Sequence, residues 1–149
     1  MGRTQVSWDP SNLENPFACI EVIVSNSEAY IQAQGELGFE FRKPIKLKAM
    51  LDTGASATVI SKIWARNSNL FQTGPDTELK VLGTTISCGE HAGSISFPGT
   101  DLRAYDPIRI VSADFLRERN FSCLIGADIL RKWKITFDGD SKLVIIKDC

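Results

Sequence analysis

One acidic residue, Asp52, stands where an apolar segment gives way to four small residues, Thr53-Gly54-Ala55-Ser56. The two hydroxyl groups and the backbone N–H groups of such a turn can donate hydrogen bonds to a carboxylate and orient it. The glycine lets another backbone or a ligand approach closely. We therefore predict that Asp52 is presented for chemistry at the end of a buried strand. An ordinary turn aspartate is the alternative, because an Asp-Thr-Gly turn between strands is common in β proteins.

A second motif, Cys123-Leu124-Ile125-Gly126-Ala127-Asp128-Ile129-Leu130, joins apolar residues, a glycine, an acid and the start of a short helix. In this order, and linked by a β-rich stretch, the two motifs resemble the signature of the retropepsins, the retroviral-type aspartic proteases. The resemblance extends from about Tyr30 to the C-terminus. It implies an all-β fold, a closed β-barrel of the acid-protease type with one short C-terminal helix and half of an active site in each chain.

The resemblance assigns roles to the residues of the first motif. Asp52 is the catalytic carboxylate, and the hydroxyl of Thr53 locks the two active-site loops of a dimer together. Gly54 leaves room for substrate, and Ala55 or Ser56 lines the site.

Two further parts of the site follow from the same resemblance. Gly126 and Asp128 support the active-site loop from below, although Asp128 is explained as well by a structural role at a helix N-terminus. The flap that closes over substrate in this family is expected between Leu79 and Phe97, with its tip near residues 88–91. Three glycines offer mobile positions there, namely Gly83, Gly89 and Gly93.

A single Asp-Thr-Gly triplet in 149 residues implies that two chains form one active site. Two carboxylates placed a few ångströms apart share one proton and hold the water that attacks the scissile carbonyl. The resemblance thus implies a homodimeric aspartic endopeptidase that cleaves a viral or retroelement polyprotein, with no metal or organic cofactor. A catalytically silent, retropepsin-like dimerisation or peptide-binding domain is the alternative.

The C-terminal hairpin beyond Trp133 departs from the lentiviral enzymes and resembles that of the gammaretroviral and ubiquitin-receptor branches. A ubiquitin-receptor protease domain is a third possibility, disfavoured because no ubiquitin-like segment flanks the motifs. The polar leader, the core motif and the cysteine-bearing flap region are together similar to the proteases of plant pararetroviruses, such as badnaviruses and tungroviruses.

The elements that must position these residues are mostly strands. Alternation of apolar and polar residues predicts half-buried strands over 31–37 and 45–51, with Gly35 and Gly38 at a bulge or bend between them. Shorter strands are expected over 58–60, 79–82, 94–97 and 108–111, a helical turn over 62–66 and a helix over 127–132. The segments 134–137 and 143–147 flank Asp138-Gly139-Asp140 and predict a hairpin. Residues 1–16 are polar and predict a flexible N-terminal leader, which leaves 17–149 as one protease domain.

Composition argues against several other partners. The formal net charge is −1 and the Lys and Arg residues are spread along the chain, so a nucleic-acid partner is not expected. No apolar run approaches the ~20 residues that span a bilayer, so we expect no membrane partner and a soluble protein, cytoplasmic or virion-associated.

The four cysteines lie far apart without a Cys-x-x-Cys pair, which indicates reduced, structural thiols. Cys88 and His91 have metal-like spacing, but no second pair completes a four-ligand site, and no metal is expected. His91 is the one histidine in the chain, so any Ser–His or Cys–His catalytic arrangement would require it. No residue near His91 in the sequence suggests the nucleophile of such an arrangement.

Overall fold

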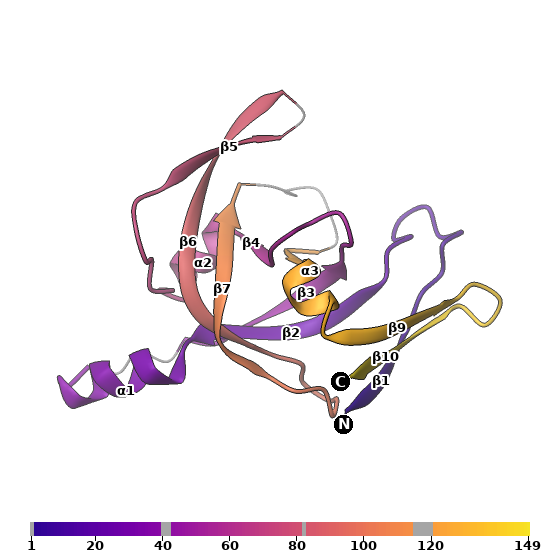
Figure 1. Ribbon diagram of the computed structural model, residues 1–149, viewed down its shortest axis with the longest axis horizontal. Helices are drawn as coiled ribbons and strands as arrows, with labels where there is room; N and C mark the ends of the chain where they lie inside the picture. The colour runs from indigo at the N-terminus through magenta and orange to yellow at the C-terminus, as the bar shows by residue number, and fades with distance from the viewer. Residues whose placement is uncertain (1, 40–42, 82, 115–120) are drawn as a thin grey trace.

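The computed structural model describes residues 2–39, 43–81, 83–114 and 121–149. The chain forms a closed six-stranded barrel and a separate three-stranded terminal sheet (Figure 1). One further strand, β5, pairs with β6 and extends the barrel sheet at that point. The strands are β1 (Arg3–Ser7), β2 (Cys19–Asn26), β3 (Ile45–Leu51), β4 (Val59–Ser61), β5 (Thr77–Val81), β6 (Thr84–Ser96), β7 (Tyr105–Ala113), β8 (Cys123–Ile125), β9 (Trp133–Asp138) and β10 (Leu143–Asp148). The helices are α1 (Glu28–Glu36), α2 (Lys62–Asn67) and α3 (Ala127–Leu130). The all-β fold expected from the sequence is confirmed.

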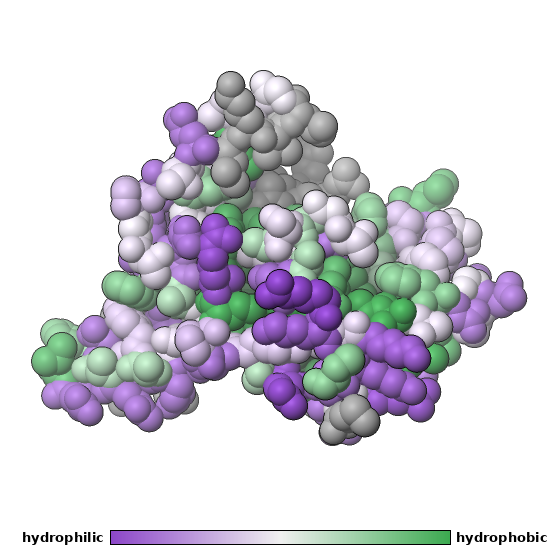
Figure 2. All heavy atoms as spheres, viewed as in Figure 1, coloured by the Kyte–Doolittle hydropathy of each residue, from purple (hydrophilic) through white to green (hydrophobic). Residues whose placement is uncertain are grey.

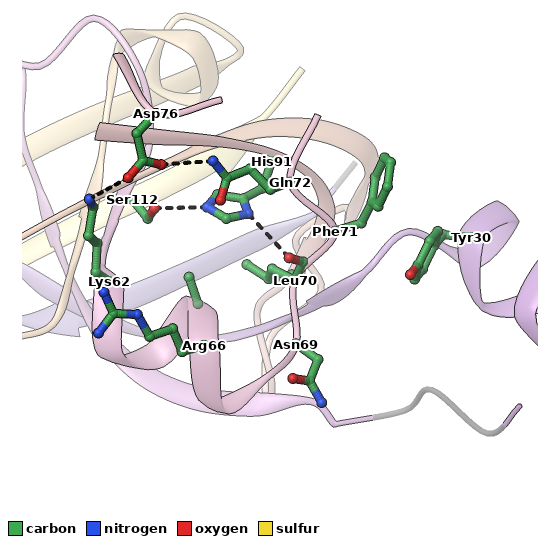
Figure 3. A pocket seen from close by; sticks show the side chains of 11 residues that line it. Tyr30, Lys62, Arg66, Asn69, Leu70, Phe71, Gln72, Asp76, His91 and Ser112 are labelled. Atoms are coloured by element: carbon green, nitrogen blue, oxygen red, sulfur yellow. Dashed lines mark hydrogen bonds and ion pairs between the residues drawn. The ribbon is translucent and has the colours of Figure 1, made fainter. Parts of the chain in front are cut away.

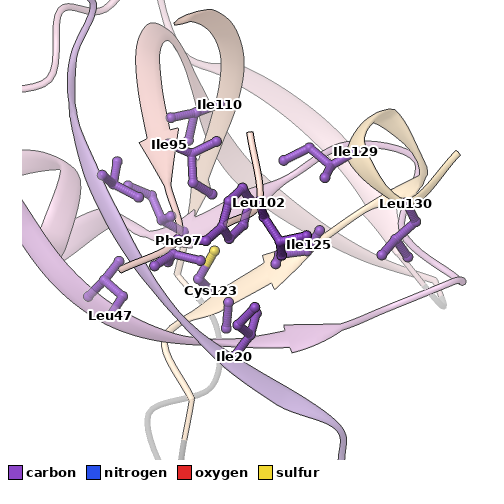
Figure 4. Close-up of a cluster of buried hydrophobic side chains, with 14 of the residues drawn as sticks. Ile20, Leu47, Ile95, Phe97, Leu102, Ile110, Cys123, Ile125, Ile129 and Leu130 are labelled. Carbon is purple, nitrogen blue, oxygen red and sulfur yellow. The ribbon is translucent and has the colours of Figure 1, made fainter. Parts of the chain in front are cut away.

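The barrel closes because β2 pairs with both β3 and β6, so that the strand order β2-β3-β8-β4-β7-β6 returns to its start. Along β3, Leu47 and Ala49 are buried whereas Lys46 and Lys48 are exposed, which is the alternation expected of a strand with one face on a core. Side chains from β2, β3, β6, β7, β8 and α3 meet inside the barrel (Figure 4). This core holds both strands that carry the sequence motifs.

The terminal sheet has the order β1-β10-β9, and β1 pairs antiparallel with β10 from Arg3 opposite Lys147 to Ser7 opposite Leu143. The prediction of a flexible leader is therefore wrong for this segment. Composition did not reveal the strand because its partner lies at the other end of the sequence, and pairing there satisfies its backbone groups. The hairpin predicted over 134–147 is confirmed as β9 and β10.

The strand predicted over 31–37 is also wrong, because this segment is the helix α1. Ser27 precedes the helix in an extended conformation, and its side chain accepts a hydrogen bond from the Tyr30 N–H at 3.4 Å. The helix buries none of its residues. Figure 1 shows it extending away from the barrel. Its alternating residues therefore face no core, and the helix-forming Glu, Ala and Gln residues around them decide the local structure.

The remaining sequence-based elements agree with the structure, including strands at β5, β6 and β7 and the helices α2 and α3. Residue 82, the last of the strand predicted over 79–82, lies outside the described residues. Gly38 follows α1 with a φ of 85°, a left-handed conformation suited to glycine. Within the described residues, no helix is long and apolar enough to cross a membrane.

Candidate active site

Asp52 lies one residue beyond β3, at the start of the turn that leads to β4. Its backbone N–H donates to the carbonyl of Ile125 at 3.0 Å, which joins it to the end of β8. One carboxylate oxygen, Oδ1, accepts from the Gly54 N–H at 2.9 Å. The other oxygen, Oδ2, has no hydrogen-bond partner among the described residues. The side chain is thus oriented by one bond and keeps one oxygen available to a second group.

The Thr53 and Ser56 hydroxyls were expected to orient this carboxylate, and they do not. Both side chains are exposed, and in the described part of the chain neither donates to Asp52. The Gly54 N–H performs this role because the tight turn folds it back toward the side chain. Ala55 is half-buried, and its carbonyl accepts from the Ala127 N–H at 2.8 Å.

The turn is held because β8 runs between the two strands that flank it. Met50 and Leu51 of β3 pair in parallel with Leu124 and Ile125, while Val59 of β4 pairs antiparallel with Leu124. The chain entering the Asp52 turn and the chain leaving it are therefore both hydrogen-bonded to one central strand. This arrangement fixes the position of the turn relative to the barrel.

A buried brace behind the turn joins the two motifs. Thr58 is fully buried, and its hydroxyl donates to Asp128 Oδ1 at 2.9 Å while its backbone N–H donates to Asp128 Oδ2 at 3.1 Å. The same hydroxyl accepts from the Gly126 N–H at 3.4 Å. Asp128 Oδ1 also accepts from its own neighbour, the Ile129 N–H, at 2.9 Å. Asp128 and Gly126 therefore contact the strand that follows the turn rather than Asp52 itself.

Gly126 is required by the close approach of the two motifs. A Cβ atom at this position would lie 2.4 Å from the carbonyl oxygen of Ala57 and 2.9 Å from that of Ala55. Real Cβ atoms do not come so near to backbone, so any other residue would push α3 away from the turn. Thr58 was missed as a site residue by the sequence analysis, which treated it as a strand residue. The position of a threonine six residues after Asp52 was the only sequence feature that could have indicated its role.

The hairpin of β5 and β6 is the candidate flap. Val81 pairs with Thr84, so the turn lies there, and Gly83 in that turn has a φ of 79°. Figure 1 shows the hairpin rising from the barrel on the side of the loop between β3 and β4. The tip expected near residues 88–91 is wrong, because these residues lie within β6 and pair with β7.

The other two glycines named for the flap serve close packing. A Cβ atom on Gly89 would lie 2.6 Å from Ser112 Oγ, and one on Gly93 would lie 2.8 Å from the Ser25 carbonyl oxygen. Both are buried within β6. They are small because neighbouring strands leave no room for a side chain.

A small apolar cluster lies between the turn and the flap. Cys88, Val111 and Ala113 are buried at its centre, and Ala57, Val59 and Ile86 pack against them. Ala57 and Val59 follow the Asp52 turn directly, and Ile86 belongs to the flap strand β6. The cluster therefore packs the segment that follows the Asp52 turn against β6 of the candidate flap.

A cavity of about 400 Å³ is lined by residues of α1, α2, β6, β7 and the segment 69–76, and by no residue of the Asp52 turn (Figure 3). At its floor, His91 Nε2 lies 2.8 Å from Ser112 Oγ, a pairing that sequence proximity did not suggest. His91 Nδ1 faces the Leu70 carbonyl oxygen at 3.4 Å, and no carboxylate of the described residues bonds to the ring. Burial lowers the pKa of His91 and favours the neutral ring. This buried pair lacks the third member of a catalytic triad.

Cys88 and His91 do not form a metal pair. They lie three residues apart on one strand, so their side chains point to opposite faces of the sheet. The described residues hold no group of three or more His, Cys, Asp or Glu side chains able to bind a metal ion. All four cysteines are free thiols, and burial raises the pKa of Cys19, Cys88 and Cys123, which disfavours the reactive thiolate.

No protein-family model matches the chain, and no curated protein matches it. Among solved structures, the chain is similar to a retropepsin-like aspartic protease from Rickettsia conorii. The TM-score is 0.59 and the sequence identity 16%, over 97% of this chain and 98% of that one. At this identity the likeness concerns the fold, so the chain has a retropepsin-like fold over almost its whole length.

Proposed function

We propose that this chain is one protomer of an aspartic endopeptidase, in which Asp52 and the same residue of a second copy form the catalytic pair. The observation that carries the proposal is the hydrogen bonding of the Asp52 carboxylate. One of its carboxylate oxygens is held by the Gly54 N–H at 2.9 Å and the other has no partner in the described chain. An oriented carboxylate with a free oxygen is what a shared proton or a catalytic water requires.

The second copy supplies what one chain lacks. Two carboxylates brought close together share one proton, so that one acts as general base toward a water and the other as general acid toward the scissile carbonyl. The exposed Thr53 hydroxyl, which bonds to nothing in the described part of its own chain, is available to the partner's loop. Activity should favour mildly acidic pH because the pair needs one proton.

The substrate is proposed to be an extended polypeptide held between the flap and the floor of the site. A strand-like segment satisfies its backbone groups by pairing with other strands, and the hairpin of β5 and β6 offers such a partner. The apolar cluster around Val59 and Val111 favours an apolar substrate side chain beside the scissile bond. A polyprotein substrate of viral or retroelement origin, including a plant pararetrovirus source, remains the sequence-based prediction.

Cleavage of a peptide library by the wild-type chain and by Asp52→Asn, at several pH values from 4 to 7, tests the proposal. The asparagine amide fills the same space, and its oxygen can accept the hydrogen bond from the Gly54 N–H. The variant should therefore stay folded and lose its peptide-cleaving activity. Wild-type activity per chain should rise with protein concentration, because the active form is a dimer. Thr136→Val on β9 is the matched control and should cleave as the wild type does.

Near-wild-type cleavage by Asp52→Asn would contradict the assignment of the catalytic residue. A folded wild-type dimer that cleaves no peptide would support the silent peptide-binding domain instead.

A further inference from the structure

Three basic side chains lie side by side across the terminal sheet. Arg3 of β1 pairs with Lys147 of β10, and Lys147 pairs with Lys134 of β9. Paired residues on neighbouring strands point to the same face, and all three side chains are exposed. These residues come from the two ends of the chain, so their dispersion along the sequence says nothing about their distance in the fold. We call them the cation row.

The cation row is not neutralised within the chain. None of the three side chains forms an ion pair or hydrogen bond with another described residue. The next position along this face of each strand is uncharged, namely Gln5, Ile145 and Thr136. The first acid along β9 is Asp138, four residues or about 13 Å from Lys134, and it accepts from the Asp140 and Ser141 N–H groups.

Such an arrangement lowers the stability of the free protein, because like charges directly opposite each other on neighbouring strands repel. A bound anion removes the repulsion. The side chains of the cation row border a hollow of about 140 Å³, together with Thr136 and Ile145. A hollow with three cations and a hydroxyl group at its rim suits a phosphate group. Figure 2 shows hydrophilic side chains gathered over the region of β9 and β10.

We propose that the cation row binds the phosphate backbone of a single-stranded nucleic acid. Two strand spacings separate Arg3 from Lys134, so the row is a line of positive charge about 10 Å long. A nucleic-acid strand is a matching line of regularly spaced negative charges. The contacts reach only phosphates, so the binding carries no sequence preference.

A lipid surface fits this face less well. Large apolar side chains that insert among lipids strengthen charge-based attachment to a membrane. Among the described residues of the terminal sheet, Phe137 is the exposed large apolar residue, and its register with Val144 and Val6 places it on the opposite face. On the face of the cation row the apolar side chains Leu143 and Ile145 are half-buried, so this face offers charge and hydrogen-bond donors without a large exposed apolar anchor.

The test is fluorescence anisotropy of a labelled 20-nucleotide oligouridylate RNA titrated with the full chain, at KCl concentrations from 50 to 200 mM. With three phosphate contacts, the logarithm of the binding constant should fall with the logarithm of salt with a slope of about −2. Binding should therefore weaken about 20-fold over this range. A dimer that engages both of its rows should give a slope of about −4.

Lys147→Gln removes the central charge of the cation row and should reduce the per-chain slope to about −1.4, so that binding weakens only about sevenfold over the same range. Its melting temperature at low salt should equal or exceed that of the wild type, because a repulsion is lost. Lys46→Gln is the matched control, since Lys46 is an exposed lysine on β3 that lies 3.7 Å from Glu21. The control should bind RNA as the wild type does.

Equal losses in the two variants, or no RNA binding by the wild type at 50 mM KCl, would overturn the proposal. Co-sedimentation with phosphatidylserine vesicles, lost in Lys147→Gln and without RNA binding, would assign the cation row to a lipid surface instead. Neither result depends on peptide cleavage, so this inference and the proposed protease activity succeed or fail separately.

Discussion

The brace behind the Asp52 turn predicts an unusual order of stability among variants of Thr58. Its side chain is fully buried, and its hydroxyl donates to the Asp128 carboxylate at 2.9 Å and accepts from the Gly126 N–H at 3.4 Å. Thr58→Val keeps the shape and removes both bonds. A hydrogen bond to a charged group contributes about 1.5–3 kcal/mol and a weaker neutral bond about 0.5–1 kcal/mol. We therefore expect Thr58→Val to lower the free energy of unfolding by about 2–4 kcal/mol.

Thr58→Ser provides the comparison, because it keeps the hydroxyl and deletes one buried methyl group. Loss of that group, with the small cavity left behind, should lower the free energy of unfolding by about 1 kcal/mol. The less apolar variant should thus be the more stable one, whereas burial of apolar surface alone predicts the reverse. Thr136→Val, at an exposed position on β9, should change stability by no more than about 0.5 kcal/mol.

Urea denaturation at neutral pH measures these differences. Globular domains have about 5–15 kcal/mol of stability, so the variants should remain folded in buffer and shift the denaturation midpoint. If Thr58→Ser proves as unstable as Thr58→Val, the hydroxyl does not hold the motifs together and the reasoning fails.

Three further predictions concern the buried Gly126, the exposed Gly35 and the buried His91. Gly126→Ala should destabilise the domain by more than about 3 kcal/mol or prevent folding, because its Cβ would lie 2.4 Å from the Ala57 carbonyl oxygen. Gly35→Ala, at a site in α1 with nothing within 4 Å, should instead stabilise the helix by up to about 1 kcal/mol in thermal denaturation. Burial lowers the pKa of His91 below its ordinary value of 6.5, so the unfolded chain takes up this proton first, and stability is lost as the pH falls from 6.5 toward the lowered folded value. The glutamine of His91→Gln does not titrate. In urea denaturation, the free energy of unfolding of this variant should therefore fall less from about pH 7 to pH 5 than that of the wild type. An equal fall in the two proteins would exclude His91 as its source.

Sequence patterns were sufficient where the relevant contacts lie within one element. In β3 the buried Leu47 and Ala49 alternate with exposed lysines, so the strand and its buried face followed from the period of two. Asp52 could be identified as a candidate site residue in the same way, because it is an acidic residue directly after a half-buried strand. The terminal hairpin followed from two apolar segments around a glycine-containing turn.

The same period of two was misleading at Ile31, Ala33 and Leu37. None of these residues is buried, because α1 extends away from the barrel, so their alternation reflects no packing. An alternating pattern identifies a strand only when one face of it reaches a core. Ser27, which caps the helix, was the better local signal.

Glycine has two uses in this fold, and the sequence does not distinguish them. Gly83 supplies a positive φ in the turn of the candidate flap, whereas Gly89 and Gly93 leave room for Ser112 and for the backbone of Ser25. The tip expected near residues 88–91 therefore fell in the middle of β6 instead of in the turn at Gly83.

The brace and the cation row are two features that local sequence patterns could not predict. Thr58 and Asp128 meet because β8 enters between β3 and β4, and Arg3 and Lys134 share a face because β10 lies between their strands. In both cases a central strand brings together residues from distant parts of the chain. A motif can therefore identify a candidate reactive residue such as Asp52, because its neighbours form the turn that presents it. The residues that hold that turn in place, and those that gather charge on a surface, are determined by strand order, which local sequence does not contain.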